Sequence, residues 1–145
     1  MARGAVVLID ADRIALIERK SPRNAGPYYL FPGGHLDERE TPADAARREA
    51  FEELGVVVHI ERLLAVSTYH GNEQHYYLAS MVSGTFGSGA GEEMRPDATQ
   101  PNGAYTPVWL RREELLRRDV RPKSLAMLLH VRGEEDLTTV VHITD

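Results

Sequence analysis

One stretch of the 145-residue chain, Gly34 to Val56, constrains the fold more than any other. It reads GHLDERETPADAARREAFEELGV and carries signals for both ends of a helix. Thr41 is a good N-cap residue, and Asp44 stands where a capping box places its acid. Gly55 can take the left-handed conformation that ends a helix. The pattern therefore predicts one helix over about residues 42–54.

The two faces of the predicted helix differ in chemistry. Glu49, Glu52 and Glu53 are three and four residues apart, so they share one face. A neighbouring apolar stripe can pack on a sheet, and it consists of Ala43, Ala46, Ala50 and Leu54. Three crowded carboxylates repel one another, and a divalent cation removes that cost. Because hard oxygen ligands suit Mg²⁺ or Mn²⁺, these glutamates are metal-ligand candidates. The alternative is a solvated helix face.

The segment before the helix favours a ligand site. Phe31-Pro32-Gly33-Gly34 leads into it, and glycines allow the backbone to approach a ligand closely. We therefore expect Gly33 and Gly34 to contribute to ligand binding, next to the acidic helix face.

The stretch 34–56 resembles the Nudix box, the signature of hydrolases that cleave nucleoside diphosphates linked to another group. Every fixed position of this signature is filled, namely Gly34, Glu40, Arg48, Glu49, Glu52, Glu53 and Gly55. One mild departure is Ala50, where a bulkier aliphatic residue is common. The resemblance implies an α/β/α sandwich with a central mixed sheet. It also implies that Arg48 and Glu40 pair to hold the loop against the helix.

The same resemblance implies a mechanism. Glu49, Glu52 and Glu53 would hold one or more Mg²⁺ ions (or Mn²⁺), which neutralise the diphosphate and activate water. A carboxylate then takes the proton from that water. Members of the family differ in which carboxylate does so, and the candidates here are Glu49, Glu53 and Glu93.

Glu93 belongs to a segment rich in Gly, Pro and Asp, residues 84–102, which is predicted to be a long loop. Many members of the family place a further carboxylate in this region, as an extra metal ligand or as the base. Glu92 and Glu93 are both available, and we prefer Glu93. The alternative is that both are solvated loop acids.

Basic and aromatic residues supply further candidates. Arg19, Lys20 and Arg23 flank the loop before the glycines, and an arginine fork suits phosphate. Ordinary surface charge is the alternative, which we favour for Arg23. His35 could face the metal cleft. A base or sugar pocket could be lined by Tyr69, His70, His75, Tyr76 and Tyr77, although packing is the commoner role of aromatic residues in strands. Trp109 is expected to be a core anchor.

The rest of the chain alternates between strand-like runs and turns. Strands are predicted over 5–9, 13–19, 28–31, 56–68, 74–86 and 105–110, and further helices over 111–118 and 123–131. The segment 138–143 fits either a final strand or ordered coil. Strands around a central helix, followed by C-terminal helices, indicate an α/β fold with a mixed sheet.

Composition narrows the functional classes. The length and the 42% hydrophobic content fit one soluble domain, residues 1–145. The net charge of −5 argues against extended nucleic-acid binding. No cysteine is present, which excludes thiolate metal sites and cysteine nucleophiles. The apolar run Ala5 to Ile9 is too short to span a membrane, and a cytoplasmic location is expected.

Positions downstream of the box bear on the substrate class. ADP-ribose-type members often carry proline fifteen residues after the box, where this chain has Gly71. Dinucleoside-polyphosphate members often carry a tyrosine one to three residues further on, where it has Asn72, Glu73 and Gln74. Nucleoside triphosphates or small nucleoside diphosphate derivatives are therefore the expected substrates.

Three hypotheses follow from the resemblance. The first is a Mg²⁺-dependent hydrolase with a small-molecule nucleotide substrate. The second is a catalytically silent nucleotide sensor of the same fold, but such proteins usually lose box carboxylates and this chain keeps them all. A diphosphate isomerase of the same fold would rely on a cysteine, which the chain lacks. The sequence leaves the oligomeric state open, a homodimer included.

Overall fold

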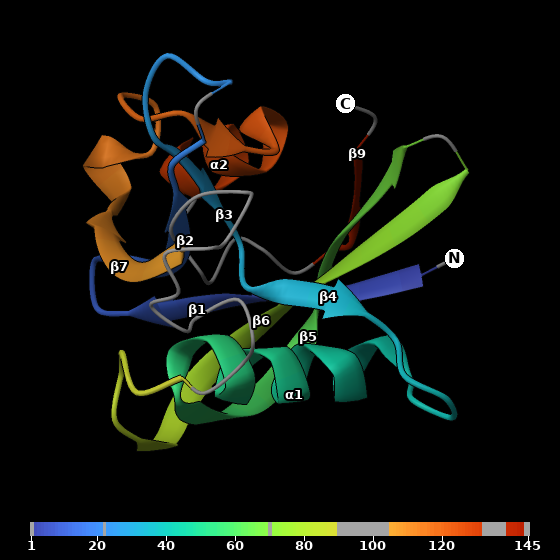
Figure 1. Cartoon of the computed structure of the whole chain (residues 1–145). Helices are drawn as coiled ribbons and strands as arrows, with labels where there is room; N and C mark the ends of the chain where they lie inside the picture. The colour runs from blue at the N-terminus through green and yellow to red at the C-terminus, as the bar shows by residue number, and fades with distance from the viewer. Residues whose placement is uncertain (1, 22, 70, 90–104, 132–138, 144–145) are drawn as a thin grey trace.

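The computed structural model describes residues 2–21, 23–69, 71–89, 105–131 and 139–143. Within these ranges, a mixed sheet lies between two α-helices (Figure 1). Helix α1 (Pro42–Leu54) covers one face of the sheet, and helix α2 (Lys123–Val131) covers the other. The predicted α/β/α sandwich is therefore confirmed. No helix in the described ranges has the length and hydropathy that a membrane span requires.

Nine strands make up the sheet in the described part of the chain. Their bounds are β1 Ala2–Asp10, β2 Arg13–Arg19, β3 Tyr28–Leu30, β4 Gly33–His35, β5 Val56–Tyr69, β6 Asn72–Gly84, β7 Tyr105–Arg111, β8 Val120–Arg121 and β9 Val141–Ile143. The order β8-β3-β2-β1-β6-β5-β9 forms the main path, while β4 pairs with β1 and β7 with β2. Strand β1 is parallel to β6 but antiparallel to β2 and β4, which makes the sheet mixed.

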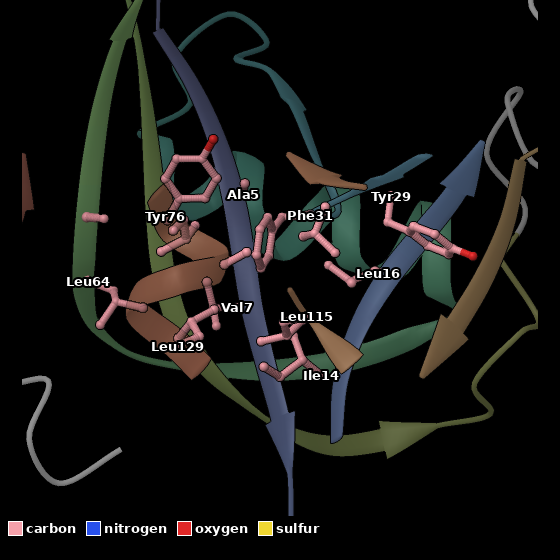
Figure 2. Packing of buried hydrophobic residues seen from close by; sticks show 14 of the residues in the cluster. Ala5, Val7, Ile14, Leu16, Tyr29, Phe31, Leu64, Tyr76, Leu115 and Leu129 are labelled. Carbon is pink, nitrogen blue, oxygen red and sulfur yellow. The ribbon is translucent and has the colours of Figure 1, made fainter. Parts of the chain in front are cut away.

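Strand β1 shows why one sheet has two buried faces. Ala5 and Val7 belong to the core on the α2 side, where they pack with Leu129 of α2. Val6 and Leu8 point to the opposite core, which is covered by α1. Because successive strand residues alternate in direction, a continuous apolar run can fill both cores. Figure 2 shows the α2-side core, with Phe31 and Tyr76 gathered near β1.

Helix α1 has the bounds that its sequence predicts. The Thr41 hydroxyl accepts a hydrogen bond from the Asp44 amide, and the Asp44 carboxylate accepts one from the Thr41 amide. At the other end, Gly55 has φ +80° and its N–H donates to the Phe51 carbonyl. A residue with a Cβ is strained in this left-handed conformation, so the sequence needs glycine there.

Three predictions about local structure need correction. The helix predicted over 111–118 is wrong, because Arg111 ends β7 and only Arg112–Glu114 form a 3₁₀ turn. The glycine segment contains strand β4, which was not predicted. The short strand β8 was not predicted, whereas the open alternative for the C-terminal segment is resolved in favour of strand β9.

Candidate functional site

The acidic face of α1 lies against strand β4. Glu49 and Glu53 are buried, with 7% and 9% of their surface exposed, whereas Glu52 is partly exposed. The Gly33 amide donates a hydrogen bond to Glu53 Oε2 at 3.2 Å. At Gly34, a Cβ atom would lie 2.5 Å from Glu49 Oε1. Gly34 thus allows the backbone of β4 to approach the buried carboxylate of Glu49 closely, whereas a Cβ at Gly33 would meet Gly4 and Ala5 of β1.

Arg48 contacts three parts of the site: the glycine loop (residues 31–35, which include strand β4), the segment before the helix and the acidic face. Its Nε donates to Glu40 Oε2 at 2.9 Å and its Nη2 to Glu40 Oε1 at 3.1 Å, which gives a two-pronged ion pair. Nη2 also donates to the His35 carbonyl at 2.9 Å. Nη1 donates to Glu49 at 2.8 Å and to Glu52 at 3.0 Å. The predicted Arg48–Glu40 pair is therefore present, with two further glutamates attached to it.

These contacts shift protonation equilibria. The hydrogen bonds from Arg48 hold the pKa of the Glu40 carboxyl below its usual value, and the Asp37 amide, which donates to Glu40 Oε1 at 2.7 Å, acts in the same direction. The hydrogen bonds to Glu40 are likewise the largest cause that raises the pKa of Arg48. Both groups are therefore charged at neutral pH, and their hydrogen-bonded contact is an ion pair.

The chemistry of the acidic face suits a hard divalent cation. Glu49, Glu52 and Glu53 supply carboxylate oxygens from adjacent turns of one helix. Within the described ranges, however, no three acidic or histidine side chains are close enough together to hold a metal. The Arg48 guanidinium forms ion pairs with Glu49 at 2.8 Å and with Glu52 at 3.0 Å. A cation would therefore take over charge that Arg48 now balances.

A pocket of about 690 Å³ opens beside the glycine loop. Its walls come from β1, β3, the paired ends of β5 and β6, and the start of α2. They are formed by Arg3, Leu30, Phe31, Ser67, Thr68, Gln74, Tyr76, Arg121, Pro122 and Lys123. This volume lies in the range of pockets that bind small molecules. Apolar rings, neutral polar groups and cations all contribute to the lining.

His35 connects the pocket to the acidic face. Arg3 Nη1 lies 3.1 Å from His35 Nε2, and Arg3 Nε donates to Gln74 Oε1 at 3.0 Å. Because arginine only donates, His35 Nε2 accepts in this contact. The carbonyl of the same histidine accepts from Arg48. One residue of β4 therefore contacts an arginine of the pocket and the arginine of the acidic face.

The other predicted site residues lie in several places. Arg19, on β2, has its guanidinium over the rings of Tyr105 and Tyr28, at 4.1 and 5.6 Å from their centroids. His75 and Tyr77 stack at 6.4 Å, and burial raises the pKa of Tyr77.

Two of the predicted aromatic residues pack in the cores. Tyr76 is buried and lines the pocket, edge-on to Phe31. Trp109 stacks on Phe86 at the edge of the α1-side core. Glu92, Glu93 and His70 lie outside the described residues.

The cations of the pocket were missed by sequence reasoning. Arg3 lies more than a hundred residues before Arg121 and Lys123, and none of the three belongs to a motif. Arg3 is on β1, Arg121 is on β8 and Lys123 begins α2, so they line one pocket only in the folded chain. No local signal in the sequence predicts such a juxtaposition.

Comparisons with known proteins complete this description. The family model described as NUDIX domain matches residues 1–131. Among solved structures, a Nudix hydrolase from Nitrosomonas europaea superposes with a TM-score of 0.71 at 17% identity, over 99% of this chain and 78% of that one.

Two further structures are similar. An ADP-ribose pyrophosphatase from Streptococcus suis has a TM-score of 0.67 at 19% identity, over 98% of both chains. A mutator MutT protein from Bacillus halodurans has a TM-score of 0.58 at 17% identity, over 99% of this chain and 90% of that one. No curated protein gives a significant match. At these identities, the structures show a shared fold.

Proposed function

Because the chain belongs to the Nudix family, whose model matches residues 1–131, we propose that it is a Mg²⁺-dependent hydrolase of small nucleotides. It cleaves the diphosphate linkage of a nucleoside diphosphate derivative or of a nucleoside triphosphate. The observation that carries this proposal is the pair of buried carboxylates, Glu49 and Glu53, held against Gly33 and Gly34. Residues 1–145 are proposed to form one such domain. The cytoplasmic location remains a prediction, and the oligomeric state remains open.

Three carboxylates of α1 are the proposed ligands of the cation. Glu49, Glu52 and Glu53 offer oxygens of the kind that Mg²⁺ or Mn²⁺ prefers. When bound, the cation supplies charge neutralisation at the phosphates and lowers the pKa of water. Ion pairs with Arg48 hold the carboxylates of Glu49 and Glu52 in place. Burial of Glu49 and Glu53 restricts their rotamers, which favours a fixed geometry.

The glycine loop and the remaining carboxylates act on the substrate and on the proton. The diphosphate would bind at the acidic face, where the backbone of Gly33 and Gly34 packs closely against Glu53 and Glu49. A carboxylate must accept the proton of the attacking water. Glu49, Glu53 and Glu93 remain the candidates for this base, with Glu93 outside the described residues. Arg19 is retained as a proposed phosphate contact.

One half of the substrate is proposed to occupy the pocket. Phe31 and Tyr76 offer aromatic surface to a base or sugar, and Gln74 offers an amide for a polar edge. The contact between Arg3 and His35 places this pocket next to the glycine loop. The diphosphate would therefore lie over α1 while its substituent enters the pocket.

A nucleotide panel tests this proposal. The purified protein is incubated with nucleoside triphosphates, ADP-ribose, nucleotide sugars and dinucleoside polyphosphates, with Mg²⁺ and with or without chelator, and all products are separated by chromatography. We expect chelator-sensitive cleavage of at least one compound. No cleavage of any compound by folded, metal-bound protein would favour a nucleotide sensor of the same fold.

The Glu53→Gln variant links the activity to the proposed site. Loss of this carboxylate should lower turnover by about a hundredfold or more, while the circular dichroism spectrum stays that of wild type. Glu113→Gln, on an exposed turn, is the matched control and should keep full activity. Full activity of Glu53→Gln would contradict the mechanism.

A further inference from the structure

The pocket carries more positive charge than a neutral nucleoside requires. Arg3, Arg121 and Lys123 line it, and no carboxylate belongs to its described lining. Arg3 is partly buried, and Arg121 and Lys123 are exposed. A pocket lined by charges of one sign attracts ions of the opposite sign, so this lining favours an anionic ligand. The question is which of these cations are already neutralised within the protein.

Arg121 is largely neutralised. Its Nη2 lies 2.8 Å from Asp119 Oδ2 and its Nε donates to Asp119 Oδ1 at 3.1 Å. These hydrogen bonds lower the pKa of the Asp119 carboxyl. The guanidinium also covers the ring of Tyr28, 4.2 Å from its centroid. Arg121 therefore shapes the pocket wall and contributes little net charge to it.

Arg3 and Lys123 differ from Arg121 in this respect. Neither forms a salt bridge within the described ranges, although the charge of Lys123 also helps to lower the pKa of the Asp119 carboxyl. Arg3 is instead held by hydrogen bonds to Gln74 Oε1 and His35 Nε2, neither of which is a carboxylate. These contacts fix the direction of the guanidinium and leave its charge uncompensated. Lys123, at the start of α2, adds a second positive charge to the same pocket.

We propose that this pocket binds a phosphate monoester on the sugar of the bound half of the substrate, with Arg3 and Lys123 as the residues that recognise it. This inference rests on the proposed function, because it assigns one half of the hydrolysed nucleotide to the pocket. The substrate class is then a nucleoside diphosphate derivative whose sugar carries a further phosphate. The apolar rings hold the nucleoside, and the two cations select for the extra anion.

The two anions of such a substrate would be bound by different groups. The diphosphate lies at the acidic face of α1, where a divalent cation is needed to offset the glutamates. The additional phosphate lies among side chains that are positive themselves and needs no metal. Its binding should therefore persist in the presence of chelator, whereas hydrolysis should not. This difference separates the inference from the proposed hydrolysis.

Calorimetry with chelator present tests the inference. The probes are AMP and CMP, their 3′,5′-bisphosphates, and adenosine 2′,5′-bisphosphate, which together vary the base and the position of the extra phosphate. A charge-assisted contact predicts that at least one bisphosphate binds about tenfold more tightly than its monophosphate. Wild-type protein that binds every bisphosphate no more tightly than its monophosphate would overturn the inference.

Two variants locate the preference. Lys123→Gln removes an exposed charge and should bring the affinity for the preferred bisphosphate down by about tenfold, with monophosphate affinity kept. Arg3→Gln should act in the same way. Arg117→Gln, an exposed arginine outside the pocket lining, is the charge-matched control and should retain the preference. If both pocket variants still bind the bisphosphate more tightly than the monophosphate, Arg3 and Lys123 do not recognise the extra phosphate and the assignment is overturned.

Failure of the inference and failure of the proposed function would look different. If the nucleotide panel is hydrolysed but no bisphosphate is preferred, only the assignment of the pocket fails. If a bisphosphate is preferred but folded, metal-bound protein cleaves neither the panel nor diphosphate compounds with a phosphorylated sugar, the hydrolase function fails. The binding preference would then still identify the ligand of a sensor.

Discussion

At the scale of single residues, the site depends on glycines as much as on carboxylates. Glu49 is buried, and the backbone of Gly34 lies where a side chain would meet it. The Nudix signature begins with this glycine, and the structure supplies a physical reason. Any Cβ at this position competes with a carboxylate oxygen for the same space.

The Gly34→Ala variant tests this reason. The added Cβ would lie 2.5 Å from Glu49 Oε1 and 2.7 Å from its Cδ, so the carboxylate must turn away. We expect kcat/KM to fall by about tenfold or more, because a misplaced ligand loses transition-state stabilisation. The Mg²⁺ concentration needed for half-maximal activity should rise.

Gly26→Ala is the control for this experiment. A Cβ at Gly26 would have no heavy atom within 4 Å, so activity should stay at the wild-type level. Unchanged kinetics and Mg²⁺ dependence in Gly34→Ala would show that Glu49 does not need its present position.

At the scale of elements, the ion pair between Arg48 and Glu40 connects the segment before α1 to the helix itself. Its two hydrogen bonds to Glu40 hold the pKa of that carboxyl below its ordinary value of 4.5. A carboxyl whose pKa is depressed in the folded state stabilises the fold above its unfolded pKa. This stabilisation is lost as the pH falls through the folded value.

The Glu40→Gln variant should therefore be less stable than wild type at neutral pH. The difference should narrow as the pH falls from the ordinary pKa of the carboxyl through its lower folded value, because the wild-type carboxyl is then protonated in both states. Urea unfolding at a series of pH values from neutral to acid measures this difference. If the difference in unfolding free energy stays constant across the series, the Arg48–Glu40 ion pair contributes no pH-dependent stability.

Local sequence signals explain which helices and strands could be predicted, and pairing between distant segments explains which could not. Helix α1 was predicted with its bounds because the cap at Thr41 and the glycine at 55 are local signals. The helix predicted over 111–118 fails because Arg111 pairs with Arg13 of β2, a contact from far along the chain. Strand β4 was missed for the same reason, since Gly33–His35 become a strand only by pairing with β1.

At the scale of the whole molecule, the same distinction separates the acidic face from the pocket. The three glutamates of α1 lie within one turn and a half of helix, so their grouping was predictable from spacing. The pocket joins residues from both ends of the chain, from Arg3 to Lys123. Strand order and the placement of α2 create it, and these are properties of the complete fold.

Binding of a divalent cation should be visible in the stability of the whole protein. The acidic face carries three carboxylates, and Arg48 balances only part of their charge. A cation that binds the folded state and not the unfolded chain adds about 2.7 kcal/mol at a hundred times its Kd. For a chain of this length, that energy corresponds to a rise in Tm of roughly 5–10 °C.

Thermal unfolding with Mg²⁺, compared with chelator at matched ionic strength, measures this rise. Because the carboxylate of Glu53 lies next to the glycine loop at the centre of the proposed site, Glu53→Gln should lose most of the Mg²⁺-dependent shift. Glu113→Gln, which removes an exposed carboxylate from the turn after β7, should keep it. Equal Tm values with Mg²⁺ and with chelator in wild type would contradict metal binding by the folded protein. A full shift in Glu53→Gln would instead place the cation elsewhere. The experiment thus tests the metal site without requiring that the substrate be known.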